Sequence, residues 1–201
     1  MLRIAHRAGN DVDRLVPALQ AGADLIEADV RRHRGRLEVR HDRRRGPMDP
    51  VLFLHALVEA LPPDAHLMLD LKGRDPRLGR AVRAAMAVAA PEVPYTVCGR
   101  AWSMLTAFDG LAHVRVVHSA GNRVELVRLL RRLWRRNTWG VSVHRALLTP
   151  QRVAWLHERA EVVMTWPVNT ASELASATAA GVDGVISDRL QDLADLLAPR
   201  G

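Results

Sequence analysis

The chain contains few cysteine, lysine and aromatic residues, and it has no long apolar run. The single cysteine, Cys98, excludes an intrachain disulfide and favours a reducing compartment, so we expect a cytoplasmic protein. Aromatic residues make up only 4% of the 201 positions, which leaves leucine, valine and alanine to fill a core. The longest apolar stretch, 51–61, is interrupted by His55 and Glu59, and no run reaches the roughly 18 residues of a membrane span. The N-terminal residues do not resemble a signal peptide, which argues against secretion.

Acidic residues are outnumbered, with 22 Asp and Glu against 29 Lys and Arg, for a formal net charge of +7. Lys72 is the only lysine, and the arginines concentrate in 31–45 and 123–136. Segment 123–136 has the pattern of an amphipathic helix whose arginines line a solvated face. Weak association of this helix with an anionic membrane surface stays open, and no nucleic-acid partner is expected.

Short β-branched runs alternate with helical patterns along the whole chain, which indicates a parallel sheet. Strands are expected at Leu2–His6, Asp24–Val30, His66–Leu71, Tyr95–Cys98, Val114–His118, Gly140–His144, Val162–Trp166 and Gly184–Ser187, with an extra extended piece at Leu37–His41. Helices are expected near 12–21, 51–60, 77–90, 101–108, 122–136, 150–159, 171–180 and 189–198.

Eight strand–helix units predict a single (β/α)₈ TIM barrel domain over residues 1–201. That fold usually needs about 250 residues and has a floor near 200, so the barrel must be compact with short loops. The alternative, an open doubly wound sheet, lacks the glycine-rich dinucleotide fingerprint after its first strand.

Three carboxylates lie on two of the expected strands. Glu27 and Asp29 are two residues apart and therefore lie on one face of their strand, and Asp70 ends the next barrel strand. Since the carboxyl ends of barrel strands meet at one rim, these oxygens could together hold a hard divalent cation such as Mg²⁺.

Histidine and positively charged side chains are expected at the same rim of the barrel. His6 and Arg7 end the first strand, His41 ends the extended piece, and Lys72 follows Asp70. Each residue alone is ordinary, as a helix cap or a surface charge, but their conjunction at consecutive strand ends favours an active site with a general acid and a general base. Three further strand-end residues are weaker candidates for the pocket: His118, His144 and Asp188.

These residues fall in segments that resemble the glycerophosphodiester phosphodiesterase family, a group of metal-using TIM barrels. The matching segments are IAHR at 4–7, AGADLIEADV at 21–30, GRLEVRHD at 35–42, LMLDLK at 67–72, VVMTWPVN at 162–169 and GVDGVISD at 181–188. The resemblance implies hydrolysis of a small-molecule glycerophosphodiester to an alcohol and glycerol phosphate, with Mg²⁺ or Ca²⁺ as cofactor.

Carried over by position, the resemblance also implies a role for each residue. The implied metal ligands are Glu27, Asp29 and Asp70, the catalytic histidines His6 and His41, and the substrate-binding residues Arg7, Lys72 and Trp166. Which histidine is the base, and whether water or a neighbouring substrate hydroxyl attacks, stay open.

The chain departs from the family pattern in three places. Ala8 stands where the family has glycine, so we expect the loop after the first strand to run differently. The family's Glu-Asn-Thr is missing, with Asn10, Asp11 and Asp13 as the nearby polar substitutes, and Asp70 replaces a glutamate. Two alternatives therefore stay open: a lipid phosphodiesterase of the lysophospholipase D type on the same site, and a decayed barrel that binds anions without turnover.

Overall fold

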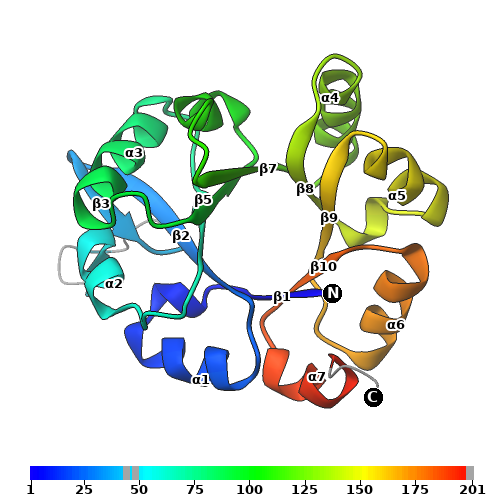
Figure 1. Ribbon diagram of the computed structural model, residues 1–201, viewed down its shortest axis with the longest axis horizontal. Helices are drawn as coiled ribbons and strands as arrows, with labels where there is room; N and C mark the ends of the chain where they lie inside the picture. The colour runs from blue at the N-terminus through cyan, green and yellow to red at the C-terminus, as the bar shows by residue number, and fades with distance from the viewer. Residues whose placement is uncertain (43–45, 47–49, 198–201) are drawn as a thin grey trace.

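A closed barrel of parallel strands forms the centre of the molecule. The computed structural model describes residues 1–42, 46 and 50–197. Within these residues eight parallel strands close into a (β/α)₈ barrel, and Figure 1 shows the helices as a ring outside them. The barrel strands are β1 (Leu2–Ala5), β2 (Leu25–His33), β5 (Leu67–Leu71), β6 (Tyr95–Gly99), β7 (Val114–Ala120), β8 (Thr138–His144), β9 (Ala160–Trp166) and β10 (Gly184–Ser187). Strand β1 closes the ring by pairing with both β10 and β2, so the predicted fold class is confirmed.

The interior of the barrel is filled by one apolar layer. Its buried members are Ile4, Leu25, Met68, Cys98, Val117, Met164 and Ile186. Because side chains of a strand alternate between its faces, the inward residue two positions later is the next one toward the carboxyl rim. On β2 and β5 that residue is a carboxylate, Glu27 above Leu25 and Asp70 above Met68. The apolar layer is therefore the floor of a polar site.

The helices cover the outside of the barrel through their leucine and valine faces. Their bounds are α1 (Leu15–Gln20), α2 (Leu54–Ala60), α3 (Arg77–Ala89), α4 (Arg123–Leu133), α5 (Pro150–His157), α6 (Ala171–Ala180) and α7 (Leu190–Leu197), with short 3₁₀ helices η1 (Ala8–Asn10), η2 (Val12–Arg14), η3 (Trp102–Phe108) and η4 (Arg145–Leu147). Helix α4 buries Leu126, Leu129 and Leu133 and exposes three of its four arginines, with Arg132 half-buried, as its amphipathic pattern predicts. No described helix is long and apolar enough to cross a bilayer.

Some expected elements were wrong in type or extent. The expected helix over 51–60 begins as a short strand, β4 (Leu52–Phe53), because this segment pairs with β3 (Arg36–Val39) before α2 starts. The expected helix over 101–108 is the 3₁₀ helix η3, and the helix over 12–21 starts with the 3₁₀ turn η2. Position 198, the expected end of the last helix, lies outside the described residues.

A β-hairpin extends β2 beyond the barrel rim. Strand β3 runs antiparallel to β2, with Val30 opposite Val39 and His33 opposite Arg36. The two-residue turn is made by Arg34 and Gly35, whose φ angles are 48° and 84°. Positive φ at both positions is the geometry of the tight turns that match strand twist, and it is easily reached by glycine. The hairpin brings His41, two residues past β3, back toward the barrel mouth.

Candidate active site

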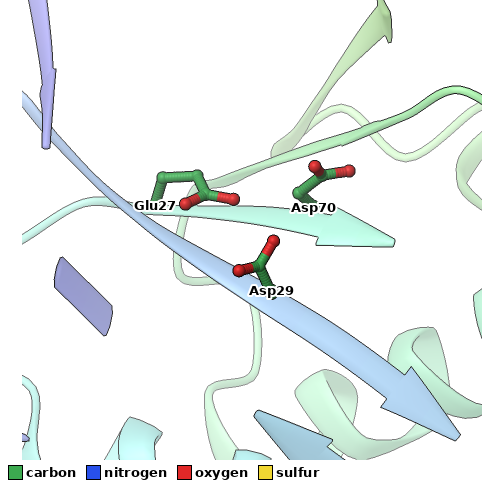
Figure 2. Close-up of side chains that lie close together, drawn as sticks. All are labelled: Glu27, Asp29 and Asp70. Atoms are coloured by element: carbon green, nitrogen blue, oxygen red, sulfur yellow. The ribbon is translucent and has the colours of Figure 1, made fainter. Parts of the chain in front are cut away.

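Three carboxylates from adjacent strands meet inside the carboxyl rim of the barrel. Asp29 of β2 lies in register with Asp70 of β5, and Glu27 is one inward position below Asp29. One oxygen of each carboxylate lies within 4.8 Å of the others, and Figure 2 shows the three side chains close together on two neighbouring strands. Glu27 and Asp29 are buried, at 2% and 0% exposure. The predicted convergence of the carboxylates is therefore present.

Lys72 supplies the nearest positive charge to this cluster. Its ammonium lies 2.7 Å from Asp29 Oδ1 and also contacts Asp70 Oδ2. Burial opposes the charge on Lys72, but Asp70 and Asp29 outweigh it and raise the Lys72 pKa above its ordinary value. The compact ammonium of a lysine fits between two carboxylates and can donate a hydrogen bond to each of them. The wider, planar guanidinium of an arginine does not fit the same gap. This geometry gives a reason for the one lysine in an arginine-rich chain.

The carboxylates differ in how their charge is compensated. Burial, followed by the charges of Asp29 and Asp70, raises the pKa of Glu27 well above its usual range. Burial would also raise the pKa of Asp29, but the Lys72 ammonium and a hydrogen bond from Asn10 lower it instead. The described residues therefore supply too little positive charge for three ionised carboxylates.

The loop after β1 supports the carboxylates through its backbone and Asn10. Arg7 takes a left-handed conformation (φ 56°), and its backbone N–H donates to Glu27 Oε2 at 2.6 Å. Asn10 donates from Nδ2 to Asp29 Oδ2 at 2.7 Å and accepts the Asp29 backbone N–H at 2.8 Å. Gly9 fits closely under this loop, since a Cβ there would lie 2.7 Å from the Ala28 Cβ. Of the three polar substitutes noted in the sequence, Asn10 is thus the one that contacts a carboxylate of the cluster.

His6 is held at the rim by Asp188, which follows β10. The His6 Nδ1 lies 2.8 Å from Asp188 Oδ1, and Asn169 Oδ1 accepts the Asp188 backbone N–H at 3.0 Å. Burial lowers the pKa of His6, and Asp188 only partly counteracts it. With Nδ1 engaged by Asp188, Nε2 is the ring nitrogen that remains for substrate.

His41 reaches the same mouth from the hairpin side. Its ring Nδ1 lies 3.0 Å from Asp42 Oδ1, and its backbone oxygen accepts a hydrogen bond from Arg31 Nε at 2.8 Å. The side chain is 39% exposed, more than that of His6 at 22%. The two histidines thus differ in environment, one half-enclosed and one near solvent.

A pocket of about 200 Å³ joins these groups. Its lining includes seven of the eight predicted site residues, namely His6, Arg7, Glu27, His41, Asp70, Lys72 and Trp166. The eighth, Asp29, is fully buried beneath Lys72 and Asn10. Arg100, which follows β6, also lines the pocket and is held by Glu125 through two hydrogen bonds of 2.8 and 2.7 Å. Arg100 could not be predicted from the sequence, because nothing in its local pattern separates it from the other arginines.

The three weaker strand-end candidates occupy different positions in the structure. Asp188 belongs to the site through His6. His144 contacts the Trp166 ring, with centroids 5.0 Å apart, and caps η4. His118 points outward from the barrel, where it contacts Trp102 and Thr138, so its expected place in the pocket is wrong. Strand alternation explains this, because the neighbouring Val117 belongs to the interior layer.

The residues present fit a divalent cation. Asp29 Oδ1 is buried and, within the described part of the chain, has no hydrogen bond of good geometry beyond its ion pair with Lys72. The donor set is three carboxylates, which suits Mg²⁺ or Ca²⁺ rather than a thiophilic metal. The arrangement can therefore hold a cation next to two imidazoles and two cationic side chains.

Comparison with solved structures identifies the same barrel in phosphodiesterases. No family model and no curated protein matches the chain. An Oleispira antarctica phosphodiesterase in complex with its product sn-glycerol-3-phosphate superposes with a TM-score of 0.79 at 18% identity, covering 97% of this chain and 96% of that one. The glycerophosphodiester phosphodiesterase of Thermotoga maritima gives 0.78 at 15% identity, covering 98% of each chain. That of Parabacteroides distasonis gives 0.78 at 18% identity, covering 98% and 95%.

At these identities the comparison establishes a shared fold over nearly the full length of each chain. It agrees with the resemblance to glycerophosphodiester phosphodiesterases carried by the sequence motifs. The chain thus has the barrel of that family, with carboxylates, imidazoles and cations gathered at its carboxyl rim.

Proposed function

We propose that this protein is a glycerophosphodiester phosphodiesterase that hydrolyses a small diester to an alcohol and glycerol phosphate with Mg²⁺ or Ca²⁺. The observation that carries the proposal is the convergence of Glu27, Asp29 and Asp70 within 4.8 Å, beside His6 and His41. The solved structures of the same fold support it, since one of them holds sn-glycerol-3-phosphate as product. Residues 1–201 are proposed to act as one catalytic domain.

The carboxylates would hold the cation through Glu27, Asp29 and Asp70. When bound, the cation would act as a Lewis acid that neutralises charge developing on the phosphoryl oxygens. Arg7 and Lys72 line the same pocket and would donate charge-assisted hydrogen bonds to those oxygens. Trp166 forms part of the opposite wall, where it would contact the glycerol or alcohol portion of the substrate.

His6 is proposed as the general base. Its lowered pKa keeps the imidazole neutral near pH 7, and Asp188 fixes its orientation through Nδ1. Nε2 would then take the proton of the attacking water or neighbouring glycerol hydroxyl, a role that contributes roughly 10²–10⁴-fold.

His41 is proposed as the general acid for the departing alcohol. Its ring lies near solvent beside Asp42, which favours exchange of protons between turnovers. The two roles are assigned from the difference in burial, because the His6 side chain is more buried than that of His41.

Weak association with an anionic membrane surface is proposed to use helix α4. This helix begins at the rim of the pocket and ends toward the opposite rim, where Arg136 pairs with Asp109 at 3.3 Å. Its exposed face combines arginines with Val124 and Val127, at 62% and 46% exposure, and Trp134, at 70%, follows its last residue. The exposed surface therefore extends along the helix from one rim to the other.

The location proposed is the cytoplasm. Cys98, the only cysteine, is a buried free thiol, and burial raises its pKa well above the ordinary value. Such a chain needs no oxidising compartment in order to fold.

The proposal is tested by product release. Soluble glycerophosphodiesters are incubated with protein and Mg²⁺, Ca²⁺ or EDTA, and sn-glycerol 3-phosphate is measured. Turnover with a cation and its loss with EDTA are expected, and His6→Ala and His41→Ala should each abolish it. Binding of diesters without turnover by the cation-loaded protein would favour the decayed anion-binding barrel instead.

A further inference from the structure

A second hollow opens beside the catalytic pocket and shares Lys72 with it. It has a volume of about 440 Å³ and lies between the β2–β3 hairpin and the loop from β5 to α3. Strand β2 creates one wall, because it continues three residues past Val30, which pairs with Leu71 at the end of β5. Gly73 begins the other wall with a φ of 113°, which turns the chain away from the barrel.

The lining of this hollow is strongly cationic. Its charged members are Arg31, Arg32, Arg40, Lys72, Arg74 and Asp75, together with His33. Within the described residues that line it, Asp75 is the only acid, and it lies 3.6 Å from Arg32. Five permanent cations and one acid among these lining residues give the hollow an excess of positive charge, which attracts an anion.

Some of these cations are already committed to protein partners. Arg40 pairs with Glu38 at 2.6 Å, and Lys72 pairs with Asp29 and Asp70. Arg74 is exposed, and the described chain holds it by no hydrogen bond or ion pair. Arg32 is exposed too, and its 3.6 Å pair with Asp75 is longer than the pairs of Arg40 and Lys72, so Arg32 and Arg74 are the side chains best placed to meet an incoming anion.

We infer that this hollow is an anion subsite for a second phosphate group on the substrate. The inference rests on the proposed function and deepens it, because it names the substrate class: a glycerophosphodiester whose alcohol carries a phosphomonoester. Lys72 lines both spaces, so the hollow lies next to the catalytic pocket, and a phosphate on the alcohol of a bound substrate is the anion nearest to it. A phosphomonoester is a compact dianion that guanidinium groups bind with paired hydrogen bonds.

The test compares two substrates that differ by one phosphate, glycerophosphoinositol and its 4-phosphate. At low ionic strength we expect wild-type kcat/KM to be at least tenfold higher for the 4-phosphate. In R32Q/R74Q this ratio should fall on the order of fivefold or more, since two partly exposed charge contacts are lost. Arg123→Gln removes one positive charge from the start of α4, lines neither pocket, and should leave the ratio unchanged.

A binding measurement separates this inference from the proposed function. Inorganic phosphate is titrated by calorimetry into the protein with EDTA present, so that no cation contributes. Weaker phosphate binding by R32Q/R74Q, but not by R123Q, supports the subsite even if neither diester is hydrolysed. A wild-type substrate ratio near one, or equal phosphate binding by all three proteins, would overturn the inference.

Discussion

Asn10 and Asp29 are joined by two hydrogen bonds, one from the Asn10 amide to the Asp29 carboxylate (2.7 Å) and one from the Asp29 backbone to the Asn10 oxygen (2.8 Å). Asp29 is completely buried, so Asn10 replaces the water that would otherwise solvate it. This one side chain ties the loop after β1 to the carboxylate cluster.

Asn10→Ala should therefore weaken both the fold and the cation site. Loss of the buried hydrogen bonds should lower the free energy of unfolding by about 1–3 kcal/mol, measured by urea denaturation. Cation affinity should fall about 10–100-fold, as is usual when a group that orients a ligand is removed. The matched control is Asn122→Ala, which removes the N-cap of α4. It should lower the free energy of unfolding and leave the cation affinity unchanged. Equal cation affinity in both variants would contradict the role of Asn10.

Asp188 is expected to act through His6 as a positioning residue. The groups facing the His6 ring are Asp188, Arg7 and Asp29, and Asp188 is the one that raises its pKa most. Asp188→Asn should lower kcat on the order of 10–100-fold. Because a base must be unprotonated, a lower His6 pKa should also move the acid limb of the pH–rate profile to lower pH.

A residue at the opposite rim of the barrel provides a control for Asp188→Asn. Asp183 contacts His157 Nε2 at 2.9 Å, in the same kind of pair, before β10. Asp183→Asn should reduce stability and leave the pH–rate profile of the remaining activity in place. A merely structural role for Asp188 would give the same unshifted profile in D188N.

Much of the site could be predicted because it depends on short-range regularities. Glu27 and Asp29 share a face through the two-residue period of a strand, and the parallel barrel brings Asp70 beside them. His6 and Asp188, in contrast, are 182 residues apart, and their pairing depends on the closure of the barrel between β1 and β10.

The errors in the fold also have physical causes. Leu52 and Phe53 carry an apolar pattern that suits a helix, but they pair with β3 instead. This strand forms because β3 offers a pairing partner, which outweighs the local helix propensity. The sequence predicts His118 in the pocket because it ends an expected strand, whereas β7 continues to Ala120 and His118 lies on the outer face of the strand.

Lys72 should not tolerate replacement by arginine. Its ammonium lies between Asp29 and Asp70, and a guanidinium is too wide to contact both and still face the pocket. Lys72→Arg should lower kcat/KM for a glycerophosphodiester on the order of 100-fold, since misplaced charge at the phosphoryl group costs that much. The reverse exchange on α4, Arg123→Lys, should change little. Wild-type kinetics in K72R would show that charge alone suffices.

His118 should make the protein less stable in mild acid. Burial, with Arg132 and Arg136 opposing and Asp109 favouring the charge, lowers its pKa to about 4, and Thr138 contacts its ring. Because the folded pKa lies below the unfolded value near 6.5, the unfolded chain binds more protons, so this stability is complete above pH 6.5 and is lost as the pH falls toward 4. The loss should reach about 3 kcal/mol.

Urea unfolding at several pH values checks this expectation. In His118→Gln, which cannot titrate, the free energy of unfolding should fall less between pH 6.5 and 4 than in the wild type. Parallel pH dependences for the two proteins would show that His118 is not the group responsible.

The most direct test of the account is a calorimetric titration of metal-free protein with Mg²⁺ and with Ca²⁺. The arrangement of Glu27, Asp29 and Asp70 predicts one cation per chain, with Glu27→Gln weakening it at least tenfold. Glu173→Gln, which breaks a surface pair with Arg145, should bind as the wild type does. Absence of cation binding by the wild type, or equal binding by E27Q, would contradict a metal-dependent phosphodiesterase at this rim.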